Sequence, residues 1–416
     1  DDPHAWRQCD TANYVWDFYK NGIDFNQPAV CWMGGYKTLI LEFPLPEAAI
    51  ALLYKVFGPY HLVGRIFFLA SFLFSAFYFR KVMELKFTSQ VSKMATLIYM
   101  MLPLSIYYSR ALHIDFFALG FSMAMLYHLY VGITLRSNLH LWLGCIFTTV
   151  ALLVKAPYIL VFGILIFPIA LRKYNFKYCL KHFYLFAIPL IAFVLWTRFS
   201  NTTNAMAPDW EFIPGYRKFD QNSHWYYGSL HQRMVGNNWV IILRRIYEEC
   251  IGGPVGLVLF IPGVIAIARS EYWKPILISL IGLMIYVAVF FNLNLQHNYY
   301  QIPFLCLAAI VLTFGAYSIA NLFKTQANKV AIALLLTHAY FNFGYSERNY
   351  FIFPVDQVEI AFHIGAHTEE NELVLVSYGG LSVHCPIILY RAHRNGWSIP
   401  NAFFDQKIAY KLNQEE

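Results

Sequence analysis

The first residues of the chain bring carboxylates and basic side chains close together. They read Asp1-Asp2-Pro3-His4-Ala5-Trp6-Arg7-Gln8-Cys9-Asp10-Thr11. A carboxylate in such a segment could act as general base on an acceptor hydroxyl, and the guanidinium of Arg7 could bind a phosphate. Helical spacing would place Asp10 and Thr11 on the same face as Arg7. The alternative is a solvated loop that leads into a helix.

Two more ionisable residues stand where apolar runs begin or end. Asp115 begins an apolar run shortly after Arg110 and His113, and Lys155 ends another run just before an Ala-Pro pair. An ionisable side chain at membrane depth is costly, so each is a candidate for a functional site. The alternatives are a favourable helix-dipole interaction for Asp115 and a snorkelling side chain for Lys155.

Glu42 and a polar hairpin supply the remaining candidates. Glu42 precedes Phe43-Pro44-Leu45-Pro46, a pattern typical of a helix start. Its alternative role is a charge at a helix N-terminus. The hairpin at 294–303 contains His297, Tyr299 and Tyr300. An aromatic belt at the membrane interface would account for the tyrosines but less well for His297.

The elements that carry these residues belong to a membrane protein. Of the 416 residues, 58% are hydrophobic and 13% are charged, whereas a soluble domain carries about 25% charged residues. The net charge of +7 does not indicate a nucleic-acid partner, because the basic residues form short clusters between apolar runs.

Ten apolar runs are long enough, or nearly long enough, to cross a bilayer. They lie at 60–79, 90–108, 114–134, 139–154, 157–171, 180–199, 252–269, 275–293, 300–323 and 328–345. Because the first apolar run arrives only after residue 38, we expect a signal or a first helix to be missing from the N-terminus. The sequence therefore predicts an all-α polytopic fold with about 10–11 membrane helices.

The distribution of basic residues predicts the orientation. Alternate connections carry thirteen Lys and Arg residues, whereas the opposite short connections carry only Arg110 and Lys155. Under the positive-inside rule the basic side is cytoplasmic. Candidates from five segments then share the outer side, as an active site requires. They are Asp2, Asp10, Glu42, Asp115, Lys155 and His297.

The same orientation suggests two domains. Residues 1–345 form the membrane domain, with outer loops at 1–58 and 200–250, and the second loop is expected to contain short interfacial helices. Residues 346–416 form a small extramembrane α/β domain, which could be truncated.

Three local patterns indicate the C-terminal α/β domain. Residues 372–377 have the pattern of a buried strand, and residues 385–390 look like a second element. Asn395-Gly396 predicts a turn.

Five short motifs together resemble a known family of membrane enzymes. The family is the GT-C lipid-linked sugar transferases, specifically the glycosyltransferase family 39 branch with protein O-mannosyltransferases and lipid A aminoarabinose transferases. The motifs are HAWRQCDTA at 4–12, EFPL at 42–45, SRALHIDF at 109–116, LLVKAP at 152–157 and HNYYQIP at 297–303. Each motif is weak alone, but the five occur in the family's order and topology over nearly the whole chain.

This resemblance implies a reaction. The expected enzyme is an inverting glycosyltransferase of the bacterial inner membrane, which moves a sugar from a polyprenyl-phosphate donor, such as undecaprenyl phosphate, at the periplasmic side. The acceptor would be a hydroxyl or phosphate of a lipid, a glycan or a protein. An acid of the first outer loop, which is expected to hold two amphipathic helices, would be the general base. The family's usual Asp-Glu pair is absent in that form, so Asp2 is the first candidate and Asp10 the second.

The resemblance also implies roles for the other candidates. Asp115 matches the family's second-loop acid, Lys155 would contact the donor phosphate, and His297 and Tyr299 would line the donor site. Lys155 or Arg7 could stabilise the charge that develops on the leaving phosphate. Further candidates for binding substrate are His4, Glu42, Arg110, His113 and Tyr300.

Some alternatives stay open at the level of the sequence. The acids could hold a divalent cation, although their spacing does not demand one. A transporter or lipid flippase could use the same polar cluster, but it would place polar residues near mid-membrane and show inverted repeats. An inactive scaffold of the same fold is a third reading.

Overall fold

The computed structural model describes the chain except residues 1–4, 174–175, 221–222, 353–354, 380–382 and 416. The chain divides into two compact units, which are described separately. The mixed unit comprises Asp1–Arg65, Leu195–Asn222 and Phe351–Glu416. The helical unit comprises Ile66–Val194 and Ser223–Tyr350.

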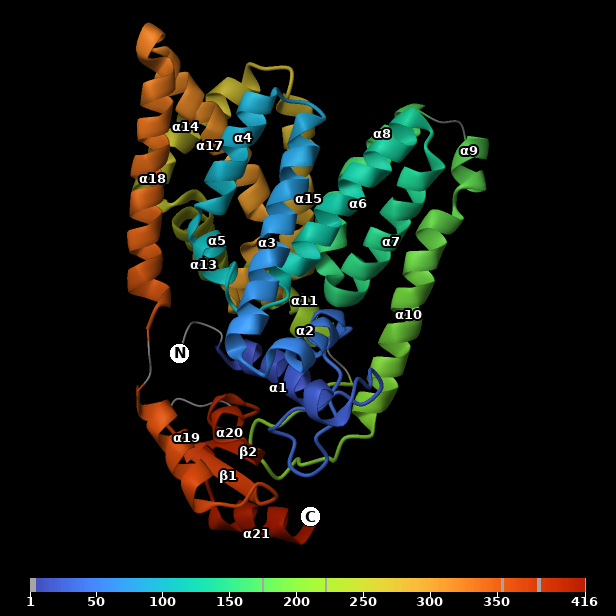
Figure 1. Ribbon diagram of the computed structural model, residues 1–416, viewed down its shortest axis with the longest axis vertical. Coiled ribbons are helices and arrows are strands. Elements are labelled where there is room, and N and C mark those ends of the chain that lie inside the picture. Colours follow the sequence, from blue (N-terminus) through green and yellow to red (C-terminus); the bar gives the residue numbers. More distant parts are fainter. Residues whose placement is uncertain (1–4, 174–175, 221–222, 353–354, 380–382, 416) are drawn as a thin grey trace. The chain divides into compact units, whose positions relative to one another are not determined.

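Helices of very different length build the helical unit (Figure 1). Its first half contains α3 (His61–Glu84), α4 (Ser89–Met100), α5 (Pro103–Tyr108), α6 (Asp115–Leu135), α7 (Asn138–Lys155), α8 (Pro157–Lys173), α9 (Phe176–Lys181) and α10 (Tyr184–Ala205). Its second half contains α11 (Ser223–Tyr227), α12 (Leu230–Met234), α13 (Gly236–Arg245), η1 (Ile246–Ile251), α14 (Gly253–Ala268), α15 (Trp273–Val289), α16 (Phe291–Gln296), η2 (Asn298–Gln301), α17 (Phe304–Asn321), η3 (Lys324–Gln326) and α18 (Ala327–Tyr350). The ends of α3 and α10 belong to the mixed unit.

Each of the ten predicted apolar runs coincides with helix, but fewer helices span a membrane by themselves. Within the described residues, α3, α6, α7, α10 and α17 are long and apolar enough to cross. A sixth span arises if the pair Gly236–Ile251 and Gly253–Ala268, bent by 86°, counts as one. Other predicted runs correspond to shorter apolar helices, such as α15 and the described part of α8 at Pro157–Ile166. The run at 90–108 is divided into α4 and α5, because Pro103 begins a new helix there.

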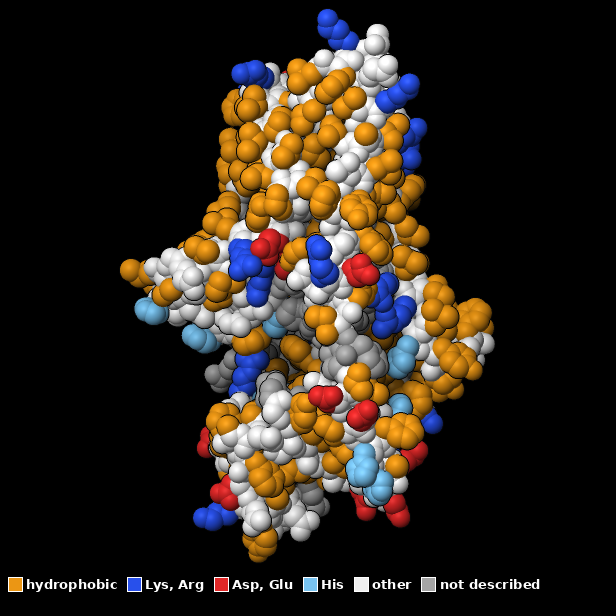
Figure 2. Space-filling view, turned by 90° about the vertical axis from the view of Figure 1, so that its left-hand side faces the viewer, with side chains coloured by type: hydrophobic (Ala, Val, Ile, Leu, Met, Phe, Trp, Pro, Cys, Tyr) orange, Lys and Arg blue, Asp and Glu red, His pale blue; other side chains and the backbone are white. Residues whose placement is uncertain are grey.

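The outward faces of the long helices show why the helical unit needs a membrane. On α3, Ile66, Leu69, Leu73 and Phe77 recur every three or four residues and are 41–57% exposed. In water such a stripe would be unfavourable, but lipid tails solvate it. Figure 2 shows hydrophobic side chains over most of the surface of the helical unit on the side of α18. Lys and Arg side chains lie at the upper end of this surface and again, beside Asp and Glu, at its lower end.

Glycines allow α14 and α17 to pack with their backbones almost in contact. A Cβ atom at Gly315 would lie 1.7 Å from the carbonyl oxygen of Leu259, and one at Gly263 would lie 2.0 Å from that of Val311. Such close approach is typical of membrane helices, because van der Waals contact rather than the hydrophobic effect holds them together in lipid.

The mixed unit combines the first loop with the end of the chain. Its elements are α1 (Ala5–Asn21), α2 (Leu45–Phe57), α19 (Val355–His367), β1 (Leu373–Tyr378), α20 (Ile387–Ala392), β2 (Asn395–Pro400), η4 (Asn401–Phe403) and α21 (Gln406–Glu415). The two strands are parallel and pair from Leu373 with Asn395 to Tyr378 with Pro400.

One hydrophobic core joins these parts of the mixed unit. Tyr14 and Trp32 of the first loop, Trp210, and Leu389 and Ile399 of the C-terminal segment are all buried in it. The C-terminal residues, which the sequence assigned to a separate domain at 346–416, therefore share a core with the first outer loop.

The C-terminal segment has the predicted strand but not the predicted turn. The strand expected at 372–377 is β1, and the second element is the helix α20. The turn expected at Asn395-Gly396 is wrong, since these residues begin β2. Gly396 is needed there because a Cβ atom would lie 1.9 Å from the carbonyl oxygen of Val374 on the paired strand.

The contact between α14 and α17 predicts a selective loss of stability. Gly315→Ala should force the two helices apart and lower the free energy of unfolding by about 1–3 kcal/mol. Gly344→Ala on α18 is the matched control, because a Cβ atom there meets nothing within 4 Å. Thermal unfolding in detergent measures both, and equal midpoints for the two variants would contradict the packing described.

Candidate functional site

A buried ion pair stands at one end of the helical unit. Asp115 is the first residue of α6 and Lys155 is the last residue of α7. Only a short turn separates these two packed helices, so the start of α6 lies beside the end of α7. The Lys155 Nζ atom lies 2.8 Å from Oδ1 and 2.9 Å from Oδ2 of Asp115. Each charge also suits the dipole of its own helix terminus.

Two further side chains complete the surroundings of the Asp115 carboxylate. His113 Nδ1 lies 2.5 Å from Oδ2, and the Tyr158 hydroxyl, from the first turn of α8, donates a hydrogen bond to Oδ1. Asp115 is 0% exposed and Lys155 is 4% exposed. A buried carboxylate is tolerated only with such partners.

Tyrosine rings surround the ammonium group of Lys155. Its Nζ atom lies 4.2 Å from the ring centroid of Tyr300, 4.7 Å from that of Tyr299 and 5.4 Å from that of Tyr158. These distances fit cation–π attraction. The His297 ring stacks on Tyr299 at 4.9 Å between centroids. Tyr299 and Tyr300 of the predicted hairpin therefore pack against the ammonium group of the ion pair.

Arg110 lies at the edge of this cluster. Its guanidinium carbon is 6.0 Å from the centroid of the Tyr107 ring, and it is only half-buried. Of the candidate site residues in this unit, Arg110 is thus the one most open to solvent.

Four buried residues of this region were not among the predicted site residues. Tyr158 contacts Asp115 as described, Asn298 donates to Glu249 over 2.8 Å, and the Tyr108 hydroxyl donates to Asn298 over 2.7 Å. Glu249, 8% exposed, lies three residues before the start of the apolar run at 252–269. It therefore carries the same signal as Asp115, an acid beside an apolar run, and could have been found from it.

A second cluster of charges lies in the mixed unit. Arg7 forms an ion pair with Glu42, and the Trp32 indole nitrogen donates to Asp10 Oδ1 over 2.9 Å. Asp10 is 0% exposed, and its Oδ2 atom has no hydrogen-bond partner among the described residues. As predicted, Arg7, Asp10 and Thr11 are together on the buried side of α1.

Burial changes the acidity of two carboxyl groups in this second cluster. It raises the pKa of Asp10 to about 7, although the Arg7 charge and the Trp32 hydrogen bond oppose the rise. Burial likewise raises the pKa of Glu47 to about 7. Glu47 was not predicted, because an acid in the first turn of a helix is ordinary in a sequence.

Two of the predicted site residues cannot be placed, and no metal-binding group is found among the described residues. Asp2 and His4 lie outside the described residues. Among the residues that the structure does describe, no three His, Cys, Asp or Glu side chains come together in a way that could hold a metal ion.

The long apolar helices define a polytopic membrane protein. No protein-family model matches the sequence, and no curated protein matches it.

Solved structures identify the fold more narrowly. The chain is similar to ArnT from Cupriavidus metallidurans bound to undecaprenyl phosphate, with a TM-score of 0.65 and 14% identity over 99% of this chain and 83% of that chain. It is also similar to the apo state of ArnT, with a TM-score of 0.60 and 12% identity over 98% and 83% of the two chains. The fold implied by the resemblance is therefore confirmed.

Removal of one charge from the buried ion pair should lower stability strongly, and removal of both charges should restore much of it. Lys155→Met leaves the Asp115 carboxylate without its ammonium partner and should lower the free energy of unfolding by about 3–5 kcal/mol. The double variant Asp115→Asn with Lys155→Met removes both charges and should recover much of this loss.

Thermal unfolding in detergent tests that expectation. Lys329→Met, which removes an exposed lysine from the start of α18, serves as control and should unfold at the wild-type temperature. A double variant as unstable as Lys155→Met would show that the pairing of charges is not what stabilises this region.

The raised pKa values of Asp10 and Glu47 predict how stability depends on pH. Both carboxyl groups bind a proton in the folded state up to about pH 7, whereas in the unfolded chain they lose it near about pH 4. The free energy of unfolding should therefore fall as pH rises from about 4 to about 7.

Chemical unfolding at a series of pH values measures this slope. Asp10→Asn should make it shallower, because one of the two groups no longer titrates. Asp24→Asn, at an exposed position, should leave the slope as it is. If the slope in Asp10→Asn were unchanged, the Asp10 carboxyl group would not be a source of this pH dependence.

Proposed function

We propose that the protein is an inverting glycosyltransferase that uses a polyprenyl-phosphate sugar as donor. The similarity to ArnT bound to undecaprenyl phosphate, which extends over 99% of this chain, carries the proposal. The acceptor would be a hydroxyl or phosphate group at the outer face of the bacterial inner membrane. The asymmetry of the Lys and Arg residues supports that side.

The cluster around Lys155 is the proposed site for the donor phosphate. An ammonium group has three N–H donors, so Lys155 can keep Asp115 as partner and still donate to a phosphate oxygen. Asp115 then acts as a positioning residue that holds Lys155 at the end of α7. Tyr299, Tyr300 and His297 line this site, and Arg110 is the accessible cation at its edge.

The base is proposed to be an acid of the first loop. A general base works best when its pKa is near the operating pH, and the pKa of Asp10 is raised to about 7. Asp2 stays the other candidate. The ion pair between Arg7 and Glu42 holds α1 to the segment before α2 and so supports the position of Asp10.

The reaction follows from these roles. The acceptor oxygen forms a bond to the anomeric carbon, and its proton passes to the carboxylate. The bond between that carbon and the phosphate oxygen breaks, and the polyprenyl phosphate leaves with the electron pair. Cationic side chains aimed at this phosphate stabilise the charge that develops on it.

Sugar transfer by the purified chain in nanodiscs, with an undecaprenyl-phosphate sugar as donor, tests the proposal. If Asp10 is the base, the rate rises with pH through about 7 and Asp10→Asn loses transfer. If Asp2 is the base, Asp2→Asn loses transfer at every pH and keeps its unfolding temperature. Lys155→Ala should weaken donor binding in either case.

Controls separate this function from its alternatives. Asp24→Asn should transfer sugar at the wild-type rate. Full transfer in both Asp2→Asn and Asp10→Asn would exclude the proposed base. Movement of the donor lipid between leaflets without transfer would instead indicate a flippase.

A further inference from the structure

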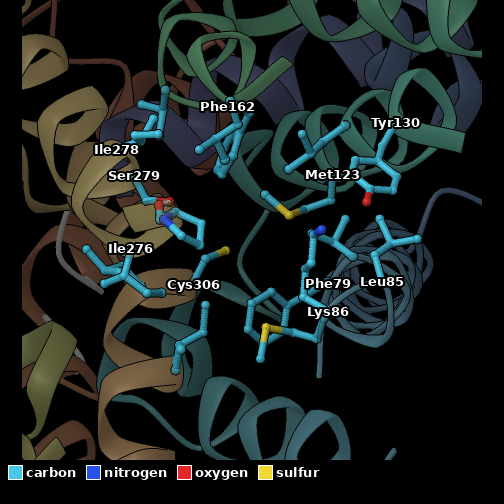
Figure 3. A pocket seen from close by; sticks show the side chains of 18 of the residues that line it. Phe79, Leu85, Lys86, Met123, Tyr130, Phe162, Ile276, Ile278, Ser279 and Cys306 are labelled. Atoms are coloured by element: carbon cyan, nitrogen blue, oxygen red, sulfur yellow. Dashed lines mark hydrogen bonds between the residues drawn. The ribbon is translucent and has the colours of Figure 1, made fainter. Parts of the chain in front are cut away.

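A cavity of about 730 Å³ lies within the helical unit. Figure 3 shows side chains of α3, α6, α8, α15 and α17 arranged around it. Its size falls within the range of about 300–1,000 Å³ that is usual for small-molecule sites. None of the residues assigned a role in the proposed function lines it.

The inner lining of the cavity is apolar. Phe79, Met123, Phe162, Leu283 and Cys306 line it, and each is at most 7% exposed. Apolar cavities do not hold ordered water well, because water finds no hydrogen-bond partners there. The lining therefore favours a hydrocarbon chain as occupant.

The rim of the cavity carries positive charge. Lys86, just after α3, and Lys274, in the first turn of α15, both line the cavity and are exposed. Neither lysine forms an ion pair in the described part of the chain. Lys86 Nζ lies 5.4 Å from the Tyr130 ring centroid, and Figure 3 shows this ammonium turned toward the cavity.

The rim lies at the opposite end of α6 from the proposed donor site. Tyr130, which lines the cavity, is fifteen residues after Asp115. That separation corresponds to about 22 Å along a helix. Lys86 and Lys274 also belong to the connections that the charge distribution places on the cytoplasmic side.

We propose that this cavity binds one acyl chain of an anionic phospholipid from the cytoplasmic leaflet, with the lipid phosphate at Lys86 and Lys274. Basic pockets between membrane helices on the cytoplasmic side recognise anionic headgroups in this way. The lipid is a second ligand, distinct from the sugar donor, and its binding does not depend on the proposed reaction.

Native mass spectrometry of the full chain tests the proposal. The chain is released from nanodiscs that contain phosphatidylglycerol, phosphatidylcholine and undecaprenyl phosphate in equal amounts. Wild type should retain phosphatidylglycerol in preference to phosphatidylcholine. Lys86→Gln and Lys274→Gln should each lower its retention about fivefold, the equivalent of about 1 kcal/mol for each basic residue near an anionic headgroup.

Matched variants separate the cavity from the surrounding bilayer. Lys329→Gln removes another exposed lysine from a basic connection and should retain phosphatidylglycerol as wild type does. Ser279→Phe places a ring in the cavity lining and should abolish retention. Leu280→Phe, at the next and exposed position of α15, should not.

Two results would overturn the proposal. Equal retention of phosphatidylglycerol in wild type, Lys86→Gln and Lys274→Gln would mean that the rim recognises no headgroup. Retention of undecaprenyl phosphate that Ser279→Phe abolishes would make the cavity part of the donor site. Neither readout involves sugar transfer, so the proposed function and this inference can fail independently.

Discussion

A carboxylate and an ammonium group buried side by side fix the geometry of one end of the helical unit. Asp115 and Lys155 lie where α6 begins and α7 ends, and both side chains are buried. Because an unpaired charge at this depth is so costly, the two helix termini must stay together. Tyr158 adds the start of α8, and Tyr299 adds the hairpin before α17. Four segments are thus tied to one pair of charges.

Much of the helical unit could be predicted from the sequence because lipid imposes simple rules. Apolar runs marked the helices, and an Ala-Pro pair correctly separated α7 from α8 at Lys155. Hydropathy alone did not show that the run at 90–108 is divided into two helices at Pro103. The charge count also placed Asp115, Lys155 and His297 on one side, and the structure shows these residues in one cluster.

The partners of the candidate residues could not be predicted, because they depend on tertiary contacts. Nothing in the sequence around Tyr158 or Trp32 distinguishes them from other aromatic residues, yet each holds a buried carboxylate. Gly396 shows that a tertiary contact can also override a local sequence signal. Its Asn-Gly pair is a strong local signal for a turn, but close pairing with β1 decides the conformation.

The core that joins the first loop to the C-terminal segment has a consequence for how the protein is made. Tyr14 and Trp32 leave the ribosome long before Leu389 and Ile399, with which they form one core. A chain is synthesised at about 5–20 residues per second, so the first loop waits tens of seconds for its partners. During that time its aromatic residues are unprotected. The first loop can therefore complete its core only after the segment that contains Leu389 and Ile399 has been made.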